Sequence, residues 1–134
     1  MTSDTDSDAE RDALEAVDAI IDDFGHDRVD EYFAGFAADA TFLFYTAPAR
    51  LESRAEYEAL WEQWVSEDRF RVLSCHSFDR RIQLFGDMAV FSHSVDTVVS
   101  VSGAEEEVHE RETIVMHRRD HGWVCVHEHL SPRP

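Results

Sequence analysis

The closing stretch of the chain, residues 111–132, constrains the fold more than any other part of the sequence. Two β-prone runs, residues 114–116 and 123–127, flank Asp120-His121-Gly122, whose glycine can adopt the positive φ of a tight turn. Pro132 ends the pattern, because proline cannot donate a hydrogen bond to a neighbouring strand. The stretch therefore predicts a β-hairpin, and we expect the rest of the chain to fold around it.

Upstream of this hairpin, the spacing of apolar residues predicts helices first and strands afterwards. Two Ser-x-x-Glu capping boxes, at Ser7 and Ser53, mark the starts of the first and third helices. The expected helices span residues 8–24, 28–37 and 54–67, and the expected strands span residues 41–46, 71–85, 88–101, 108–118 and 123–130. This order predicts an α+β fold in which three N-terminal helices pack on one face of a strongly curved, mostly antiparallel sheet. A sheet curled in this way encloses a cavity at its open end.

The length of 134 residues and a hydrophobic content of 43% predict one globular domain, residues 8–134, after a disordered acidic tail, residues 1–7. No apolar run approaches the roughly 18–20 residues of a membrane span. The acidic N-terminus also lacks the apolar stretch of a signal peptide. We therefore expect a cytoplasmic protein.

The charge balance is extreme, with 29 acidic residues against 12 basic ones and a formal net charge of −17. All the basic residues are arginines. Such a surface repels nucleic acids and anionic membranes, so neither is expected as a partner. An acidic excess without lysine resembles proteins of salt-loving archaea, in which molar salt shortens the Debye length to about 3 Å and screens the self-repulsion. An acidic patch that binds a basic partner is the alternative.

The chain lacks the residues that several kinds of catalysis and cofactor binding require. Cys75 and Cys125 are too few for a disulfide scaffold and are expected to be buried free thiols. Without lysine there is neither Schiff-base catalysis nor an anchor for pyridoxal phosphate. The sequence contains no glycine-rich phosphate loop, Gly-x-Ser-x-Gly elbow or Cys-x-x-Cys motif. We therefore expect no cofactor, and nucleotide binding and nucleophilic hydrolysis are poorly supported.

The predicted element order resembles the cone-shaped fold of the nuclear transport factor 2-like superfamily, which includes SnoaL-like polyketide cyclases and ketosteroid isomerase. More narrowly, residues 112–120 and 126–131, with Trp123 between them, resemble the association (hub) domain of calcium/calmodulin-dependent protein kinase II. The resemblance covers residues 14–132. It implies a cone-shaped fold and a homodimer, or a larger assembly of the same chain, formed through the outer face of the sheet.

The sequence departs from the hub domain at its pocket. The hub domain lines this pocket with arginines that bind carboxylates, and the matching positions here are Val95, Ile114 and Leu130. We therefore do not transfer carboxylate binding to this chain, and we expect a largely apolar pocket for a small apolar or amphipathic molecule. The match places the even-numbered residues of the last two strands in the pocket, although a β-bulge would exchange the two faces.

The pattern His127-x-His129 has two interpretations. Two histidines at this spacing share a strand face, about 6.5–7 Å apart, and could bind a metal ion with a third ligand. Cys125, assigned to the same face, is about 13 Å from His129 along a straight strand, so the three cannot bind one ion. The pocket assignment favours the second interpretation, in which both histidines lie on the outer face. We therefore predict interface residues and no metal site.

If even-numbered positions face the pocket, Glu112 and Glu128 point into the cone. Burial in an apolar cavity raises the pKa of a carboxyl and suits it to act as a general base, which is the role of an aspartate in ketosteroid isomerase. Tyr32 or Tyr45 could supply the hydrogen-bond donor, and His93 is a further polar group on the same wall. Alternatively, the glutamates pair with arginines near the strand ends and the histidine is a satisfied core residue.

A set of mostly aromatic residues is expected to form the core and the pocket wall together, because the two are continuous in such a fold. The predicted pocket residues are Tyr32, Phe36, Tyr45, Leu60, Trp61, Trp64, Phe91, Val95, Ile114, Met116 and Leu130. Three functions stay open. The first is a domain that binds a small molecule. The second is a cofactor-independent isomerase, cyclase or hydratase that uses Glu112, Glu128 or His93 as general base. The third is a homo-oligomeric assembly module.

Overall fold

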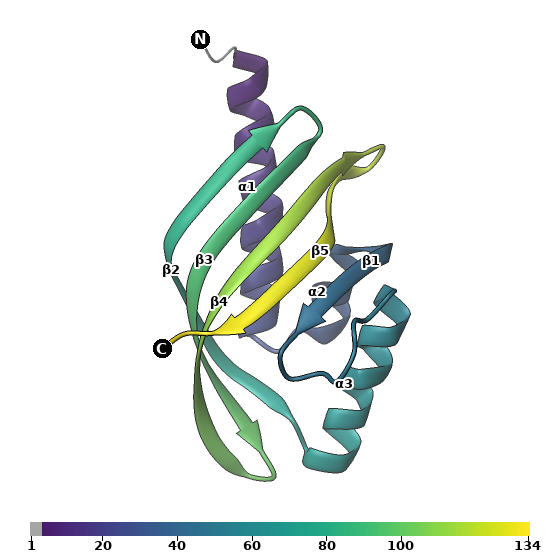
Figure 1. Cartoon of the computed structure of the whole chain (residues 1–134), viewed down its shortest axis with the longest axis vertical. Coiled ribbons are helices and arrows are strands. Elements are labelled where there is room, and N and C mark those ends of the chain that lie inside the picture. The colour runs from purple at the N-terminus through teal and green to yellow at the C-terminus, as the bar shows by residue number, and fades with distance from the viewer. Residues whose placement is uncertain (1–3) are drawn as a thin grey trace.

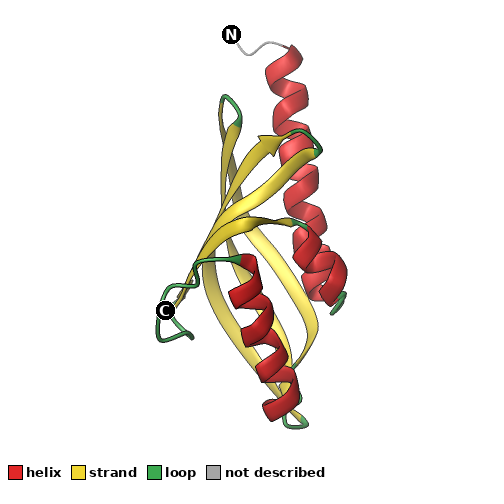
Figure 2. Ribbon diagram, turned by 90° about the vertical axis from the view of Figure 1, so that its right-hand side faces the viewer, coloured by secondary structure: helices red, strands yellow, loops and turns green. Residues whose placement is uncertain are grey.

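A computed structural model of the chain describes residues 4–134. Within these residues the chain forms three helices and one five-stranded sheet with the order β1-β5-β4-β3-β2. The helices are α1 (Asp4–Gly25), α2 (Val29–Ala34) and α3 (Arg54–Asp68), and the strands are β1 (Phe36–Phe44), β2 (Arg71–Phe85), β3 (Met88–Val101), β4 (Ala104–Arg119) and β5 (Gly122–Pro132). Strand β1 pairs with β5 in parallel, and all other pairs are antiparallel. The helices lie on the concave side of the curled sheet (Figures 1 and 2).

This arrangement confirms the predicted α+β cone. The closing hairpin is present, with Arg119 of β4 opposite Gly122 of β5. Gly122 adopts a φ of 117°, and Gly86 adopts a φ of 64° in the turn between β2 and β3, so both turns use the backbone freedom of glycine. Strand β2 is irregular, because its register with β3 shifts between Phe78 and Arg81.

The first helix begins earlier than its capping box predicts. Helix α1 starts at Asp4, so Ser7 lies inside the helix and does not cap it. Residues 4–7 therefore belong to the helix and not to a disordered tail, while residues 1–3 lie outside the described residues. The second capping box is confirmed, because the Ser53 hydroxyl accepts a 3.2 Å hydrogen bond from the backbone N–H of Glu56. None of the described helices is long and apolar enough to cross a membrane.

Helix α2 is shorter, and strand β1 starts earlier, than the sequence predicts. The predicted helix 28–37 ends at Ala34, and the predicted strand 41–46 instead spans Phe36–Phe44. Long-range pairing explains the difference, because the backbone N–H of Cys125 donates a 2.9 Å hydrogen bond to the carbonyl oxygen of Gly35. This contact with β5 converts the last residues of an apolar helical pattern into strand.

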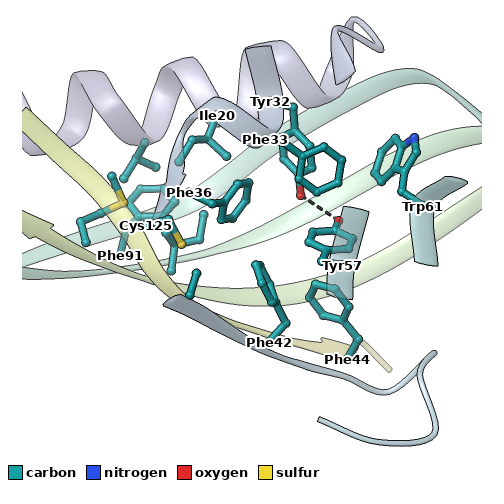
Figure 3. Close-up of a cluster of buried hydrophobic side chains, with 14 of the residues drawn as sticks. Ile20, Tyr32, Phe33, Phe36, Phe42, Phe44, Tyr57, Trp61, Phe91 and Cys125 are labelled. Carbon is teal, nitrogen blue, oxygen red and sulfur yellow. Dashed lines mark hydrogen bonds between the residues drawn. The ribbon is translucent and has the colours of Figure 1, made fainter. Parts of the chain in front are cut away.

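The hydrophobic core fills the space between the helices and the concave face of the sheet. Its largest fully buried members include Phe36, Phe42, Phe91, Ile114 and Met116. Helix α3 adds Tyr57, whose ring centroid lies 4.7 Å from that of Phe42 (Figure 3). Burying side chains of this size stabilises the fold by about 1.5–3 kcal/mol each.

Strand β5 contains a β-bulge that decides which of its side chains face inwards. Cys125 pairs with Met116 and His127 pairs with Val115, so Val126 is an extra residue on β5. As a result Cys125 and Glu128, three positions apart, are both buried on the concave side. The prediction that Cys125 shares a face with His127 is therefore wrong, whereas the inward position of Glu128 is correct.

Candidate functional site

A cavity of about 310 Å³ lies between the helices and the concave face of the sheet. Its inner end is formed by buried side chains, which include Tyr32, Tyr57, Trp61, His93 and Glu128. Its outer end is formed by exposed residues, which include Tyr45, Thr46, Asp68 and Glu106. Valine and aromatic side chains line most of the wall between the two ends. The cavity is therefore largely apolar, with a small set of polar side chains in its wall.

Hydrogen bonds join polar side chains from three neighbouring strands at the inner end. His93 of β3 lies directly opposite Glu112 of β4, and its Nε2 is 2.7 Å from Glu112 Oε1. The other ring nitrogen, Nδ1, is 2.6 Å from the hydroxyl of Ser77 on β2. In the neutral tautomer that carries its proton on Nε2, His93 donates to Glu112 and accepts from Ser77. The serine and histidine thereby fix the orientation of the Glu112 carboxylate.

Glu128 of β5 completes this group. It is only 2% exposed, and burial raises its pKa well above the usual range, with the charge of Glu112 as the second cause. Within the described residues, neither Glu112 nor Glu128 forms an ion pair with an arginine, so the alternative of structural salt bridges is wrong. When Glu128 is protonated, the site holds a carboxylic acid, Glu128, next to a carboxylate, Glu112. Two such groups can deliver and remove a proton within one site.

Two tyrosines of the helices lie close to this carboxyl pair. The hydroxyls of Tyr32 on α2 and Tyr57 on α3 are 2.9 Å apart (Figure 3). Burial raises the pKa of both hydroxyls, and ionisation of Glu128 would raise it further. They are therefore neutral donors that can stabilise negative charge on a ligand oxygen. Nearby, the indole Nε1 of Trp61 is buried with no partner among the described residues, so a ligand acceptor would satisfy it.

A second polar group, absent from the predicted site, lies further out along β4. Glu110 is 8% exposed, lines the cavity and accepts a 2.6 Å hydrogen bond from the hydroxyl of Tyr45. Burial raises the pKa of Glu110. Its even position on β4 places it on the same face as Glu112, so the strand periodicity contained the signal that identifies it.

The structure brings together many of the residues predicted from the sequence. The predicted acid–base residues His93, Glu112 and Glu128 line the cavity, as do the predicted pocket residues Tyr32, Tyr45, Trp61, Trp64, Val95 and Leu130. The prediction is wrong for five others. Phe36, Phe91, Ile114 and Met116 are buried in the core, and Leu60 is half-buried on α3 without lining the cavity. Tyr57 and Glu110 are the main additions.

The two histidines near the end of β5 lie away from the cavity. His127 hydrogen-bonds through Nδ1 to the hydroxyl of Thr41 on β1, at 2.9 Å, and His129 is exposed. Across residues 4–134 no three side chains of the metal-binding types are grouped closely enough to hold an ion. Contacts of His127 and His129 with another chain, through the outer face of the sheet, stay a prediction.

The family follows from a match that covers most of the chain. The model of the SnoaL-like domain matches residues 13–134, and this protein therefore belongs to the SnoaL-like family. No curated protein matches the chain significantly.

Solved structures share the fold at low sequence identity. A proposed scytalone dehydratase from Novosphingobium aromaticivorans is 15% identical, with a TM-score of 0.81 over 98% of this chain and 88% of that one. A ketosteroid isomerase-like protein from Erwinia carotovora atroseptica is 13% identical, with a TM-score of 0.76 over 93% of this chain and 96% of that one. The hub of calcium/calmodulin-dependent protein kinase II from S. rosetta is 18% identical, with a TM-score of 0.74 over 92% of this chain and 96% of that one. These likenesses establish the nuclear transport factor 2-like fold.

Proposed function

We propose that this protein is a cofactor-independent enzyme that moves protons on a small, mostly apolar carbonyl compound, as an isomerase, cyclase or dehydratase does. The hydrogen-bonded group Ser77–His93–Glu112, with the buried Glu128 beside it, is the observation that carries the proposal. A protein that only binds an apolar molecule has no need to bury these titratable groups at the end of its cavity, because burial of charge costs free energy.

Each group has a role that its surroundings support. Glu112, held by His93, is the base that removes a proton from the carbon next to the carbonyl. The Tyr32 and Tyr57 hydroxyls donate to the oxygen on which negative charge then develops. Glu128 carries a proton and gives it either to another carbon, which is isomerisation, or to a departing hydroxyl, which is dehydration. Similarity to an isomerase-like protein and a proposed dehydratase supports the same class of chemistry.

Exchange of hydrogen for deuterium tests the proposal without knowledge of the natural substrate. A panel of cyclic and aryl ketones is incubated with the protein in D₂O, and loss of the α-proton signal is followed by NMR. We expect exchange of at least one bound ketone to be about 100-fold faster than in buffer, the low end of general base catalysis. Glu112→Gln should abolish this rate while the ketone still quenches the fluorescence of Trp61 and Trp64.

The matched control is Glu107→Gln, which removes the same charge from an exposed position of β4 and should leave exchange unchanged. If ketones bind in the cavity and are neither exchanged nor converted, the proposal is wrong. The protein is then a binding domain without turnover, which is the first function that the sequence suggests.

A further inference from the structure

The charged groups that line the cavity are almost all negative. Its lining includes the carboxylates of Asp68, Glu106, Glu110 and Glu112, together with Glu128, which burial holds in the protonated, neutral form. Among the described residues the one basic side chain of the lining is His93, which already hydrogen-bonds to Glu112. A negatively charged ligand would therefore meet repulsion without a compensating cation, whereas a positively charged one would be attracted.

Glu110 is a buried carboxylate of this lining that has no counter-ion among the described residues. Its side chain is buried, and the hydroxyl of Tyr45 donates to it at 2.6 Å. No basic side chain within residues 4–134 forms an ion pair with this carboxylate. The neighbouring Arg133 donates instead to the backbone carbonyl oxygen of Glu110, at 3.2 Å, and pairs with Asp96. A buried carboxylate with only a neutral partner is costly, and a cation supplied by a ligand would reduce that cost.

Aromatic rings line the same cavity. Trp64 and Phe70 line it with their ring centroids 5.5 Å apart, and Trp61 follows with its centroid 5.1 Å from that of Phe70. The faces of aromatic rings attract organic cations, most strongly where water is excluded. A buried carboxylate and aromatic rings in one cavity are the two features that recognise an alkyl ammonium group.

We propose that the substrate is an organic amine, a mostly apolar molecule whose ammonium group pairs with Glu110 in the cavity that the aromatic rings line. This identification rests on the proposed function, because the proposed function makes the cavity the place where the substrate binds. Glu110 and Glu112 are two residues apart on β4, which is about 7 Å along a strand. The ammonium group therefore lies about 7 Å from the carbon that reacts, with an apolar portion between them.

Three probes of one shape test this assignment. They are 4-phenylbutylamine, 4-phenylbutanol and 4-phenylbutyrate, which share a phenyl ring on a short alkyl chain and end in a cationic, a neutral and an anionic group. Binding to the whole protein is measured by tryptophan fluorescence and calorimetry at pH 8, where an alkyl amine is protonated. Salt at about 1 M shortens the Debye length to about 3 Å and suppresses attraction to the acidic surface. We expect the amine to bind at least about tenfold more tightly than the alcohol, with the carboxylate weakest.

Two substitutions locate the preference. Glu110→Gln should remove the advantage of the amine over the alcohol, and the exposed control Glu107→Gln should keep it. Equal binding of amine and alcohol, stronger binding of the carboxylate, or binding of none of the probes to the wild-type protein would overturn the inference. If Glu110→Gln does not fold, the wild-type series decides alone.

The two proposals fail separately. An amine preference together with a lack of any ketone or amino-ketone exchange rejects proton transfer and leaves an amine-binding cavity. Exchange of neutral ketones without an amine preference rejects the amine and leaves the enzyme.

Discussion

At the scale of single residues, Glu128 shows how burial raises the pKa of an ordinary side chain. The residue has no arginine partner among the described residues and faces another carboxyl, Glu112. Its surroundings therefore favour the protonated form, which packs against the neutral hydroxyls of the inner end. Ionisation of the buried Glu128 therefore lowers the free energy of unfolding, and this effect depends on pH.

We predict that Glu128→Gln stabilises the protein near pH 8 and has little effect near pH 4. Between the usual pKa of 4.5 and the raised pKa in the folded protein, the folded state binds more protons than the unfolded state. The contribution of Glu128 to the free energy of unfolding therefore falls as pH rises through this window. Glutamine mimics the protonated side chain, so the variant does not lose stability as pH rises. Thermal unfolding of both proteins at several pH values measures the difference, and an equal gain at pH 4 and pH 8 would reject this account.

At the scale of elements, strand periodicity in the sequence predicts most of the candidate site. The alternation of β4 correctly places Glu112 inwards, and the same rule on β3 places His93 beside it. The bulge at Val126 could not be predicted, because an extra residue in a strand leaves no mark in composition or periodicity. Sequence patterns also do not separate the core from the cavity wall, since a buried aromatic such as Phe36 has the same pattern whether or not free space lies beside it.

The short α2 and the early start of β1 have a different explanation. Residues 35–37 follow a helical apolar pattern, and the pairing of Phe36 with Cys125 on β5 overrides it. Partners so distant in sequence cannot be recognised from local propensity. The general α+β arrangement was predictable because it needs only the order and type of the elements.

Strand β1 should be essential for stability through its aromatic face. Phe42 has no exposed surface and packs against Phe36, Phe44 and Tyr57. We predict that Phe42→Ala lowers the free energy of unfolding by about 3–5 kcal/mol, because it removes a large buried side chain and leaves a cavity. Urea unfolding at one fixed protein concentration measures this change.

Phe85→Ala is the matched control, because Phe85 is 59% exposed at the end of β2. Its effect should stay within about 0.5 kcal/mol. If the two variants lose similar amounts of unfolding free energy, burial of Phe42 does not stabilise the fold as predicted.

At the scale of the whole molecule, the helices cover only one face of the sheet (Figures 1 and 2). The other face carries the half-buried Val98, Val115 and His127 together with the exposed His129. The prediction that this outer face joins two copies of the chain rests on these residues. Self-association must overcome the net charge of −17, so it should strengthen as salt screens the repulsion. The salt requirement of the fold itself and the cytoplasmic location stay predictions.

Substitution of exposed histidines tests this assembly. We predict a dimer by size-exclusion chromatography with light scattering, more complete at about 1 M salt than at about 0.1 M. His129→Glu adds negative charge to the outer face and should weaken the dimer about tenfold or more. His121→Glu makes the same change at the exposed β4–β5 turn and should not. A wild-type monomer at both salt concentrations would rule out the proposed dimer.

The parallel pairing of the first strand with the last determines when the protein can fold during synthesis. Helices α1 and α2 and strand β1 leave the ribosome with an apolar face whose strand partner, β5, has not yet been made. At ordinary rates of translation the wait lasts roughly 5–20 seconds. The nascent chain therefore exposes its aromatic residues for much longer than a hairpin needs to form. Such a chain is a natural client for chaperones that shield apolar segments until the final strand arrives.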